Sequence, residues 1–426
     1  MFSIIKLKKK QNQKALEPLI ATILLIVVSV ILVTIVLTWG KEFSTSSLNK
    51  TDNFGELKAS DATHFIYSKS TNEGVVQFTY SPPAEIKKDI NITHYRVTNI
   101  PEMTEPIALS EPKILSPSLN ILELPCLYEY STTTPDLYIQ LITADNTFID
   151  IKTKDAGMVC SSGGTGTEVD PIVICNAEDL NNVRNDLDAN YSLGKDIDLQ
   201  CFSRLDVNGW LPIGSESSPF IGQFNGDNYT IKNMYIYRPS TTIVGFFGRI
   251  GLNSNITISL IDTNVSGLNG VGILAGWADS SAIISNSYTT GNVYGTTEVG
   301  GLIGFDYGSI NNSYSLANVS GTSFVGGLIG SKDGSGTISN SYSTGLVTGT
   351  TTGGFIANYK GGTITNSYWD VNTSGKLTSA GSGATGKTTS EMKTQSTFTD
   401  WDFSSIWAID STKNDGYPYL RNNPPR

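Results

Sequence analysis

The feature that most constrains the fold of this 426-residue chain is a repeat in its C-terminal half. Copies of 26 to 28 residues begin at Asn264, Asn292, Asn318 and Leu346. Each holds a glycine-rich run (VGILAG, VGGLIG twice and GGFIAN) and then an I-x-N-S-Y segment. Such short β-rich runs cannot form independent sheets, but stacked copies can pair strand on strand. We therefore predict a mostly β chain in which residues 171–426 form a right-handed parallel β-helix (solenoid) with coils of 26–28 residues.

Side-chain alternation in a strand predicts which residues of I-x-N-S-Y face the core. Because the isoleucine should point inward, the asparagine and tyrosine should do so too, and the two flanking residues should face solvent. Stacked copies would then form structural ladders of buried amides and rings, at Asn286, Asn312, Asn340, Asn366, Tyr288, Tyr314, Tyr342 and Tyr368. If the same columns instead faced outward, they would be a candidate glycan-binding surface.

Both ends of the repeat region carry signals of closure, which a solenoid needs because open strand edges invite aggregation. Asn176 is a predicted helix N-cap, followed by an apolar stripe at Leu180, Val183 and Leu187. Near the other end, Thr388 and Glu391 have the spacing of a capping box in a segment rich in Trp and Tyr.

The region before the repeats divides into four parts. Residues 1–15 form a basic leader, and 16–43 form a hydrophobic helix containing 21 uncharged residues, Leu19 to Trp39. At about 1.5 Å per residue such a helix spans a bilayer. Residues 44–160 are a polar stalk and a small β-domain, in which LYIQLITADNTFIDIK predicts a hairpin, and 161–170 are a linker.

The charge distribution sets the topology and excludes one class of partner. Five lysines precede the helix, which places the N-terminus in the cytoplasm and the rest outside. From Leu16 onward 24 basic residues face 39 acidic ones, a net charge of −15. Since nucleic-acid phosphates require basic patches, we expect no nucleic-acid partner.

Two kinds of modification are expected on the outer part. Four cysteines there favour disulfides, and sequence order suggests Cys126–Cys160 and Cys175–Cys201 among three pairings, with free thiols as the alternative. N-x-S/T sequons mark candidate glycosylation sites, although a Ser/Thr-rich chain produces many by chance; they are Asn49, Asn91, Asn190, Asn228, Asn255, Asn264, Asn311, Asn318 and Asn372.

The segment KALEPLIATILLIVV resembles the start of archaeal type IV pilin-like proteins, in which a basic leader precedes an apolar-x-Pro segment and helix. The resemblance implies cleavage by a prepilin-peptidase-like enzyme between Ala15 and Leu16, although Ala15 stands where such leaders more often have glycine. A second archaeal leader pattern would make Gln13 the new N-terminus. We favour cleavage at Ala15–Leu16.

Residues from about Asp170 to Leu420 resemble surface proteins that carry the GLUG motif, through VGGLIG, FNGDNYTIKNMYI and SYWDVNTSGKLTSAGSGATGKT. This resemblance implies a surface or adhesin domain; the motif itself does not encode binding residues. The VGGLIG glycines should serve close coil packing rather than phosphate binding, because they recur in every copy without a following Lys-Ser/Thr.

We expect no enzyme activity, no cofactor and no metal site. Carboxylates do not recur in phase on neighbouring coils, and both histidines, His64 and His94, lie before the repeats. The predicted function is a cell-surface, pilin-like filament subunit or adhesin, located at the cell membrane with its C-terminal domains outside. Its expected partners are the membrane, the processing peptidase, other pilins or its own copies, and a glycan or other surface ligand. A membrane-anchored structural protein that never polymerises is the alternative, and a carbohydrate-active β-helix enzyme is a third.

Overall fold

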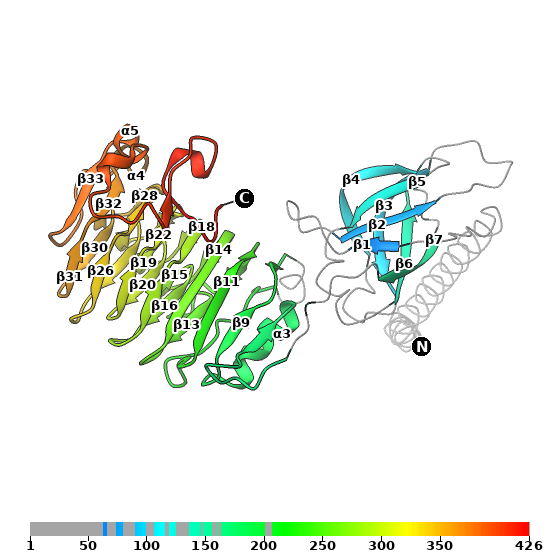
Figure 1. The fold of residues 1–426 in the computed structure, drawn as a ribbon, viewed down its shortest axis with the longest axis horizontal. Coiled ribbons are helices and arrows are strands. Elements are labelled where there is room, and N and C mark those ends of the chain that lie inside the picture. The colour runs from blue at the N-terminus through cyan, green and yellow to red at the C-terminus, as the bar shows by residue number, and fades with distance from the viewer. Residues whose placement is uncertain are drawn as a thin grey trace, which may run out of the picture. The chain divides into compact units, whose positions relative to one another are not determined.

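A computed structural model describes residues 63–65, 74–79, 90–98, 106–115, 119–124, 136–144, 146, 148–155, 160, 163–200 and 207–425. The chain divides into two compact units. One is a small β-domain, and the other contains the repeats (Figure 1).

The small β-domain is a seven-stranded sheet in the order β4-β3-β6-β7-β1-β2-β5. Its strands are β1 (Thr63–Phe65), β2 (Gly74–Thr79), β3 (Ile90–Val97), β4 (Ile107–Leu115), β5 (Leu119–Leu124), β6 (Asp136–Thr143) and β7 (Phe148–Asp155). β6 and β7 are neighbours joined by a turn in which Asn146 adopts a left-handed φ of 58° and its amide donates to the Thr143 carbonyl. The predicted hairpin is confirmed.

The predicted leader and hydrophobic helix lie outside the described residues. Within the part of the chain that the structure describes, no helix has the length and apolar character needed to cross a bilayer.

The repeats form a parallel β-solenoid of about five turns, as predicted from their period. Two faces are sheets of one strand per coil. The first contains β13 (Phe247–Ile250), β16 (Ala275–Ala278), β20 (Ile303–Asp306), β25 (Ile329–Lys332) and β30 (Ile356–Tyr359). The second contains β15 (Asn269–Gly272), β19 (Thr297–Gly300), β24 (Ser323–Gly326) and β29 (Thr352–Gly353).

The third sheet has 17 strands and winds along the rest of each coil. Its early strands are β8 (Ile172–Ile174), β9 (Tyr191–Leu193), β10 (Ile197–Asp198), β11 (Gln223–Lys232), β12 (Tyr235–Tyr237) and β14 (Asn255–Ser266). Its later strands are β17 (Ile283–Ser285), β18 (Tyr288–Tyr294), β21 (Ser309–Asn311), β22 (Tyr314–Ser315), β23 (Asn318–Ser320), β26 (Thr337–Ser339), β27 (Tyr342–Ser343), β28 (Val347–Thr348), β31 (Thr363–Thr365), β32 (Ser367–Asp370) and β33 (Ala384–Lys387).

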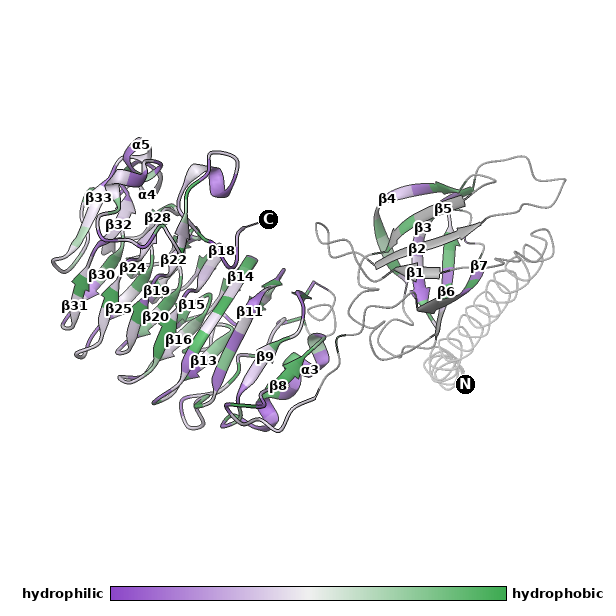
Figure 2. Cartoon of the chain, in the orientation of Figure 1, coloured by the Kyte–Doolittle hydropathy of each residue, from purple (hydrophilic) through white to green (hydrophobic). Residues whose placement is uncertain are grey.

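The register aligns like residues of successive coils, so the core is built from columns of one residue type. One column pairs Ile256, Ile284, Ile310, Ile338 and Ile364, all of which are buried in the main core. Hydrophobic residues recur along the stacked strands in Figure 2. The expectation that these isoleucines point inward is confirmed.

The glycines of VGGLIG allow the first two sheets to approach closely. A Cβ on Gly300 would lie 2.0 Å from the Ile303 carbonyl oxygen, and one on Gly304 would lie 2.3 Å from the Val271 amide nitrogen. Neither glycine has a positive φ, so what these positions require is space. The glycines therefore serve close coil packing.

Both ends of the solenoid are covered, as the capping signals predicted. At the start, helix α3 (Ala177–Asn182) is capped by the Asn176 side chain, which accepts from the Asp179 amide at 2.8 Å, and a 3-10 turn, η2 (Val183–Asn185), follows it. At the other end, Ser379 and Ala380 bond to Ile356 of β30, where the Ala380 amide donates to the Ile356 carbonyl. Helices α3 and α5 mark these two ends in Figure 1.

Residues 388–425, here called the C-terminal segment, begin with helix α5 (Thr389–Met392), which has the predicted capping box between Thr388 and Glu391. Helix α4 (Val371–Ser374) precedes this segment. The segment continues through η4 (Gln395–Thr397), β34 (Trp407–Ala408), η5 (Asn414–Gly416) and β35 (Tyr419–Leu420), where β34 and β35 pair antiparallel.

The disulfide pairing expected from sequence order is wrong. Cys160 is bonded to Cys175, with Cα atoms 5.6 Å apart. Gly163 accepts from the Val173 amide, so the linker folds back along β8 and brings Cys160 to that strand. Cys126 and Cys201 lie outside the described residues.

Candidate functional site

The predicted alternation through I-x-N-S-Y ends at the asparagine. Asn286, Asn312, Asn340 and Asn366 all have a left-handed φ of 46° to 48°, which turns the chain between two short strands. Asn adopts this conformation more readily than other non-glycine residues. Asn312, Asn340 and Asn366 are half-buried, whereas Asn286 is exposed, and Asn340 Nδ2 donates to Asn312 Oδ1 at 3.4 Å. The inference that asparagine and tyrosine share the isoleucine face is therefore wrong.

The serine after each asparagine is buried, contrary to the expectation that it faces solvent. In this serine ladder each hydroxyl donates to a carbonyl two residues back and accepts an amide from the preceding coil; its members are Ser287, Ser313, Ser341 and Ser367. Ser287 N donates to Ser313 Oγ at 3.2 Å, and Ser313 N donates to Ser341 Oγ at 3.2 Å. The hydroxyls thus provide bonds between coils at the turn.

The tyrosine column is buried, but outside the main core. The rings of Tyr288 and Tyr314 stack with centroids 4.8 Å apart, as do those of Tyr314 and Tyr342. The C-terminal segment covers them with Met392, Phe398, Trp401, Trp407, Tyr417 and Leu420. Tyr342 also donates its hydroxyl to the Pro418 carbonyl at 2.6 Å. In this structure the column is therefore closed to a ligand.

An aromatic cluster remains accessible on the outside of the first sheet; Trp277, Phe305 and Tyr307, with Arg249 and Asp279, are here called the aromatic patch. Sheet register aligns Arg249, Trp277 and Phe305 on consecutive strands. Trp277 lies 4.9 Å from Phe305 and 5.6 Å from Tyr307 between ring centroids. Trp277 and Tyr307 are half-buried, so part of each side chain is open to solvent.

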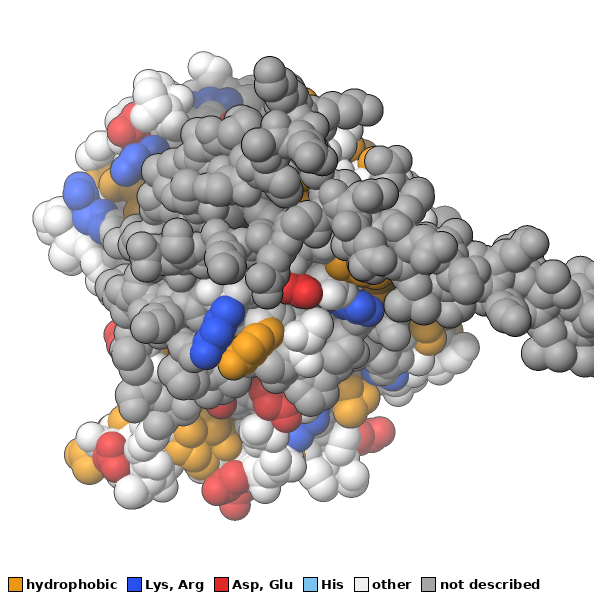
Figure 3. Space-filling model, turned by 90° about the vertical axis from the view of Figure 1, so that its right-hand side faces the viewer, with side chains coloured by type: hydrophobic (Ala, Val, Ile, Leu, Met, Phe, Trp, Pro, Cys, Tyr) orange, Lys and Arg blue, Asp and Glu red, His pale blue; other side chains and the backbone are white. Residues whose placement is uncertain are grey.

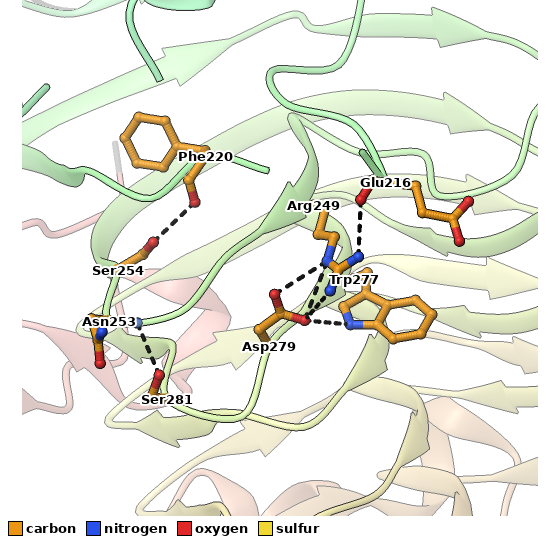
Figure 4. Close-up of polar contacts among 8 residues, drawn as sticks. All are labelled: Glu216, Phe220, Arg249, Asn253, Ser254, Trp277, Asp279 and Ser281. Carbon is orange, nitrogen blue, oxygen red and sulfur yellow. Dashed lines mark hydrogen bonds and ion pairs between the residues drawn. The ribbon is translucent and has the colours of Figure 1, made fainter. Parts of the chain in front are cut away.

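Polar contacts hold the Trp277 end of the patch in place (Figure 4). Arg249 donates through Nε and Nη2 to Asp279, with the shortest contact at 2.9 Å, and through Nη1 to the Glu216 carbonyl. Trp277 Nε1 donates to Asp279 Oδ1 at 3.0 Å. Because Arg249 and Trp277 both donate to the Asp279 carboxylate, the indole is already ordered in the absence of a partner. Less side-chain entropy is therefore lost when a partner binds.

The surroundings of the patch are acidic. Partial burial, together with the charges of Asp333, Glu298 and Asp279, raises the pKa of Tyr307. Burial also raises the pKa of Glu298, while Lys360 opposes that shift. Aromatic rings can stack on the C–H face of a sugar, and carboxylates beside them can accept hydrogen bonds from its hydroxyls.

A buried ion pair lies inside the same sheet, at positions that the sequence did not mark as related. Asp306 and Lys332 are register partners with fully buried side chains, and Lys332 Nζ lies 3.1 Å from Asp306 Oδ2. The ammonium also donates to the carbonyls of Gly308 and Asp333. Burial raises the pKa of Asp306, opposed by Lys332 and by a bond from the Gly308 amide. The pair is fully enclosed, so it is structural.

The sequons fall into two groups. Four asparagines use the side-chain oxygen as a hydrogen-bond acceptor within the fold: Asn190, Asn311, Asn318 and Asn372. The other four that the structure describes are exposed, namely Asn91, Asn228, Asn255 and Asn264; from the first group, Asn318 and Asn372 are exposed as well. Asn49 lies outside the described residues. On the face drawn in Figure 3, described side chains of both charge signs are interspersed.

The fold defines this chain as a β-solenoid protein with closed ends and a lateral aromatic patch. Two curated proteins are similar to parts of it. It is 36% identical over 153 residues to halomucin of Haloquadratum walsbyi, covering 33% of this chain and 2% of halomucin. It is 40% identical over 94 residues to a protein of Evansella cellulosilytica described as a Gly-rich membrane protein, covering 22% of this chain and 11% of that protein. No family model matches the chain.

Proposed function

We propose that this chain is a cell-surface protein that displays the solenoid for adhesion, with the aromatic patch as the contact surface. The observation that carries the proposal is the pre-ordered, partly exposed cluster of Trp277 and Tyr307 on the side of a solenoid with covered ends. Rigid aromatic side chains supply contact area at low entropic cost. Display outside the cell is supported by the similarity to halomucin and to a Gly-rich membrane protein.

We further propose that the N-terminal part is pilin-like and that the solenoid belongs with the GLUG-type surface domains. The basic leader and KALEP support processing between Ala15 and Leu16 and assembly into filaments through the apolar helix. The proposal contains no catalytic step, cofactor or nucleic-acid partner.

Electron microscopy of sheared surface filaments, with an antibody to the solenoid, tests assembly. Label along or at the tip of filaments, together with an N-terminus at Leu16 by mass spectrometry, is expected. Label confined to the cell envelope with an intact leader would leave the non-polymerising anchored protein instead.

Adhesion through the patch is tested with Tyr307→Ala. Tyr294→Ala is the matched control, because Tyr294 is 47% exposed and lies on a different sheet. Cells carrying Tyr307→Ala should adhere less to a surface on which wild-type cells settle, and cells carrying the control should adhere equally. Equal loss or no loss in both would contradict a role for the patch.

A further inference from the structure

A polar cavity of about 350 Å³ lies between the solenoid and the C-terminal segment. Its walls are a bulge in β11, where the register with β14 shifts between Asn225 and Thr230, the turn at Asn286, and residues around β34 and β35. Six side chains characterise it and define what is here called the amide pocket: Asn225, Asp227, Asn228, Asn286, Asn422 and Asn423.

Five of these six side chains are primary amides, which carry a donor and an acceptor side by side. Two of them are already engaged within the fold, because Asn423 donates through Nδ2 and Asn225 accepts through Oδ1. This leaves the amides of Asn228, Asn286 and Asn422 for a ligand. Asp227 adds a carboxylate, and no lysine, arginine or histidine is among the described lining residues. Such a set favours an uncharged ligand with many hydroxyl groups over an anion. Ile406, which is only partly buried, adds an apolar wall against which a C–H face can pack.

The backbone holds this pocket open. Asp227, Asn228 and Asn286 have left-handed φ values of 48°, 69° and 47°, and Asn225 Oδ1 accepts from the Asp227 amide. Asn423 Nδ2 donates to Ser259 Oγ at 2.9 Å and to the Tyr229 carbonyl at 3.2 Å, which fixes the C-terminal segment at the rim. A pre-formed pocket of this size matches the range found for small-molecule sites.

Asn286 differs from its counterparts in later coils. Asn312 and Asn340 bond to each other, whereas Asn286 is the first of the four and lines the cavity. Its backbone amide donates to the Asn311 carbonyl, and its side chain forms no hydrogen bond with the residues that the structure describes. A residue that is structural in later coils is thus available to a ligand here.

We propose that the amide pocket binds a single neutral sugar residue. Vicinal hydroxyls pair with the amides and Asp227, and one ring face packs on Ile406. The site is separate from the aromatic patch and does not depend on whether the chain forms filaments. Since Asn228 is also a sequon, a glycan attached there would stand at the rim of the pocket and compete with a free sugar.

The test uses the full chain in detergent, made in a host that adds no N-glycans. Glucose, galactose, mannose and N-acetylglucosamine are titrated by calorimetry, with glucuronate as the charged probe. At least one neutral sugar should bind with a Kd below about 10 mM. Glucuronate should bind at least about tenfold more weakly, because Asp227 repels it.

Asn286→Gly should lower the affinity at least about tenfold, since glycine keeps the left-handed turn but removes the amide. The matched control is Asn366→Gly, which has the same φ but lies outside the pocket. Asn422→Ala, at an exposed position, should also weaken binding without disturbing the fold. Absence of binding by all four sugars, unchanged binding in both pocket variants, or loss in Tyr307→Ala instead would overturn the proposal.

Discussion

At the residue scale, the serine of each N-S-Y triplet adds side-chain hydrogen bonds between coils at the turn. Ser313 accepts the Ser287 amide and donates to the Asn311 carbonyl at 2.8 Å, in full burial. The sequence presents this serine as plainly as the asparagine, but strand alternation assigns it to solvent. The left-handed asparagine of each coil reverses that assignment, and alternation alone contains no signal for it.

We predict that Ser313→Ala destabilises the solenoid by about 1–3 kcal/mol, because the Ser287 amide loses its buried acceptor. The control is Ser335→Ala, at an exposed position, which should stay within about 0.5 kcal/mol. Tryptophan fluorescence during urea unfolding measures both, since five of the six tryptophans lie in the solenoid: Trp210, Trp277, Trp369, Trp401 and Trp407. Equal, small effects would contradict the ladder.

The buried ion pair gives a second prediction. Lys332→Met should cost about 3–5 kcal/mol, because it leaves Asp306 charged and enclosed, and Asp306→Leu with Lys332→Met should recover most of that loss. Burial raises the pKa of Asp306, so the folded state binds a proton more readily than the unfolded chain. Stability of the variant relative to wild type should therefore improve as pH falls and worsen as pH rises. A single-variant cost below about 1 kcal/mol would contradict this account.

At the scale of elements, the solenoid, the coil length and both caps were predictable because each rests on a local or periodic signal. Glycine spacing, the N-cap at Asn176 and the Thr388–Glu391 box are all visible within a few residues. The covering of the tyrosine column was not predictable, because the Tyr342 hydroxyl donates to the carbonyl of Pro418, which lies 76 positions later in the sequence. The aromatic patch was also missed, because its members come together through register between coils.

The glycine runs give a prediction for the packing of the two facing sheets. Gly300→Ala should destabilise the solenoid by about 1–3 kcal/mol or more, since its Cβ would lie 2.0 Å from a backbone oxygen. Gly163→Ala is the matched control, because a Cβ there meets no atom of the described residues within 4 Å. Urea unfolding should separate the two, and similar midpoints would argue against close packing as the role of VGGLIG.

The C-terminal segment should loosen in acid. Hydrogen bonds from Thr388, from Ser404 and Ser405, and from Thr412 hold the pKa values of Glu391, Asp402 and Asp410 below their ordinary range. For such groups the stabilisation is complete above the ordinary pKa, about 4, and is lost as pH falls below it.

Acrylamide quenching of Trp401 and Trp407 should therefore rise between pH 5 and pH 2, while the circular dichroism of the solenoid strands persists. Asp402→Asn should show a smaller dependence on pH in this range. Quenching that stays flat down to pH 2 would contradict the role of these carboxylates.

At the scale of the whole molecule, the disulfide shows why sequence order is a poor guide to pairing. Cys160 lies before the linker and Cys175 after β8, yet the fold-back at Gly163 brings them together. Non-reducing peptide mapping should recover Cys160 and Cys175 in one linked pair. A Cys126–Cys160 peptide, or an alkylatable thiol at either position, would contradict the structure.

The path of the C-terminal segment has a consequence for how this protein can change length. Repeat proteins commonly gain or lose whole repeats, because each one contacts only its neighbours. Here one segment starts beside Tyr368, where Phe398 packs 5.2 Å away, and runs back across the coils until Asn423 bonds to Ser259. With an added coil, the segment would be too short to keep both contacts. With one coil fewer, it would be longer than the distance between them. The length of the C-terminal segment therefore restricts how many coils can lie between its two contacts.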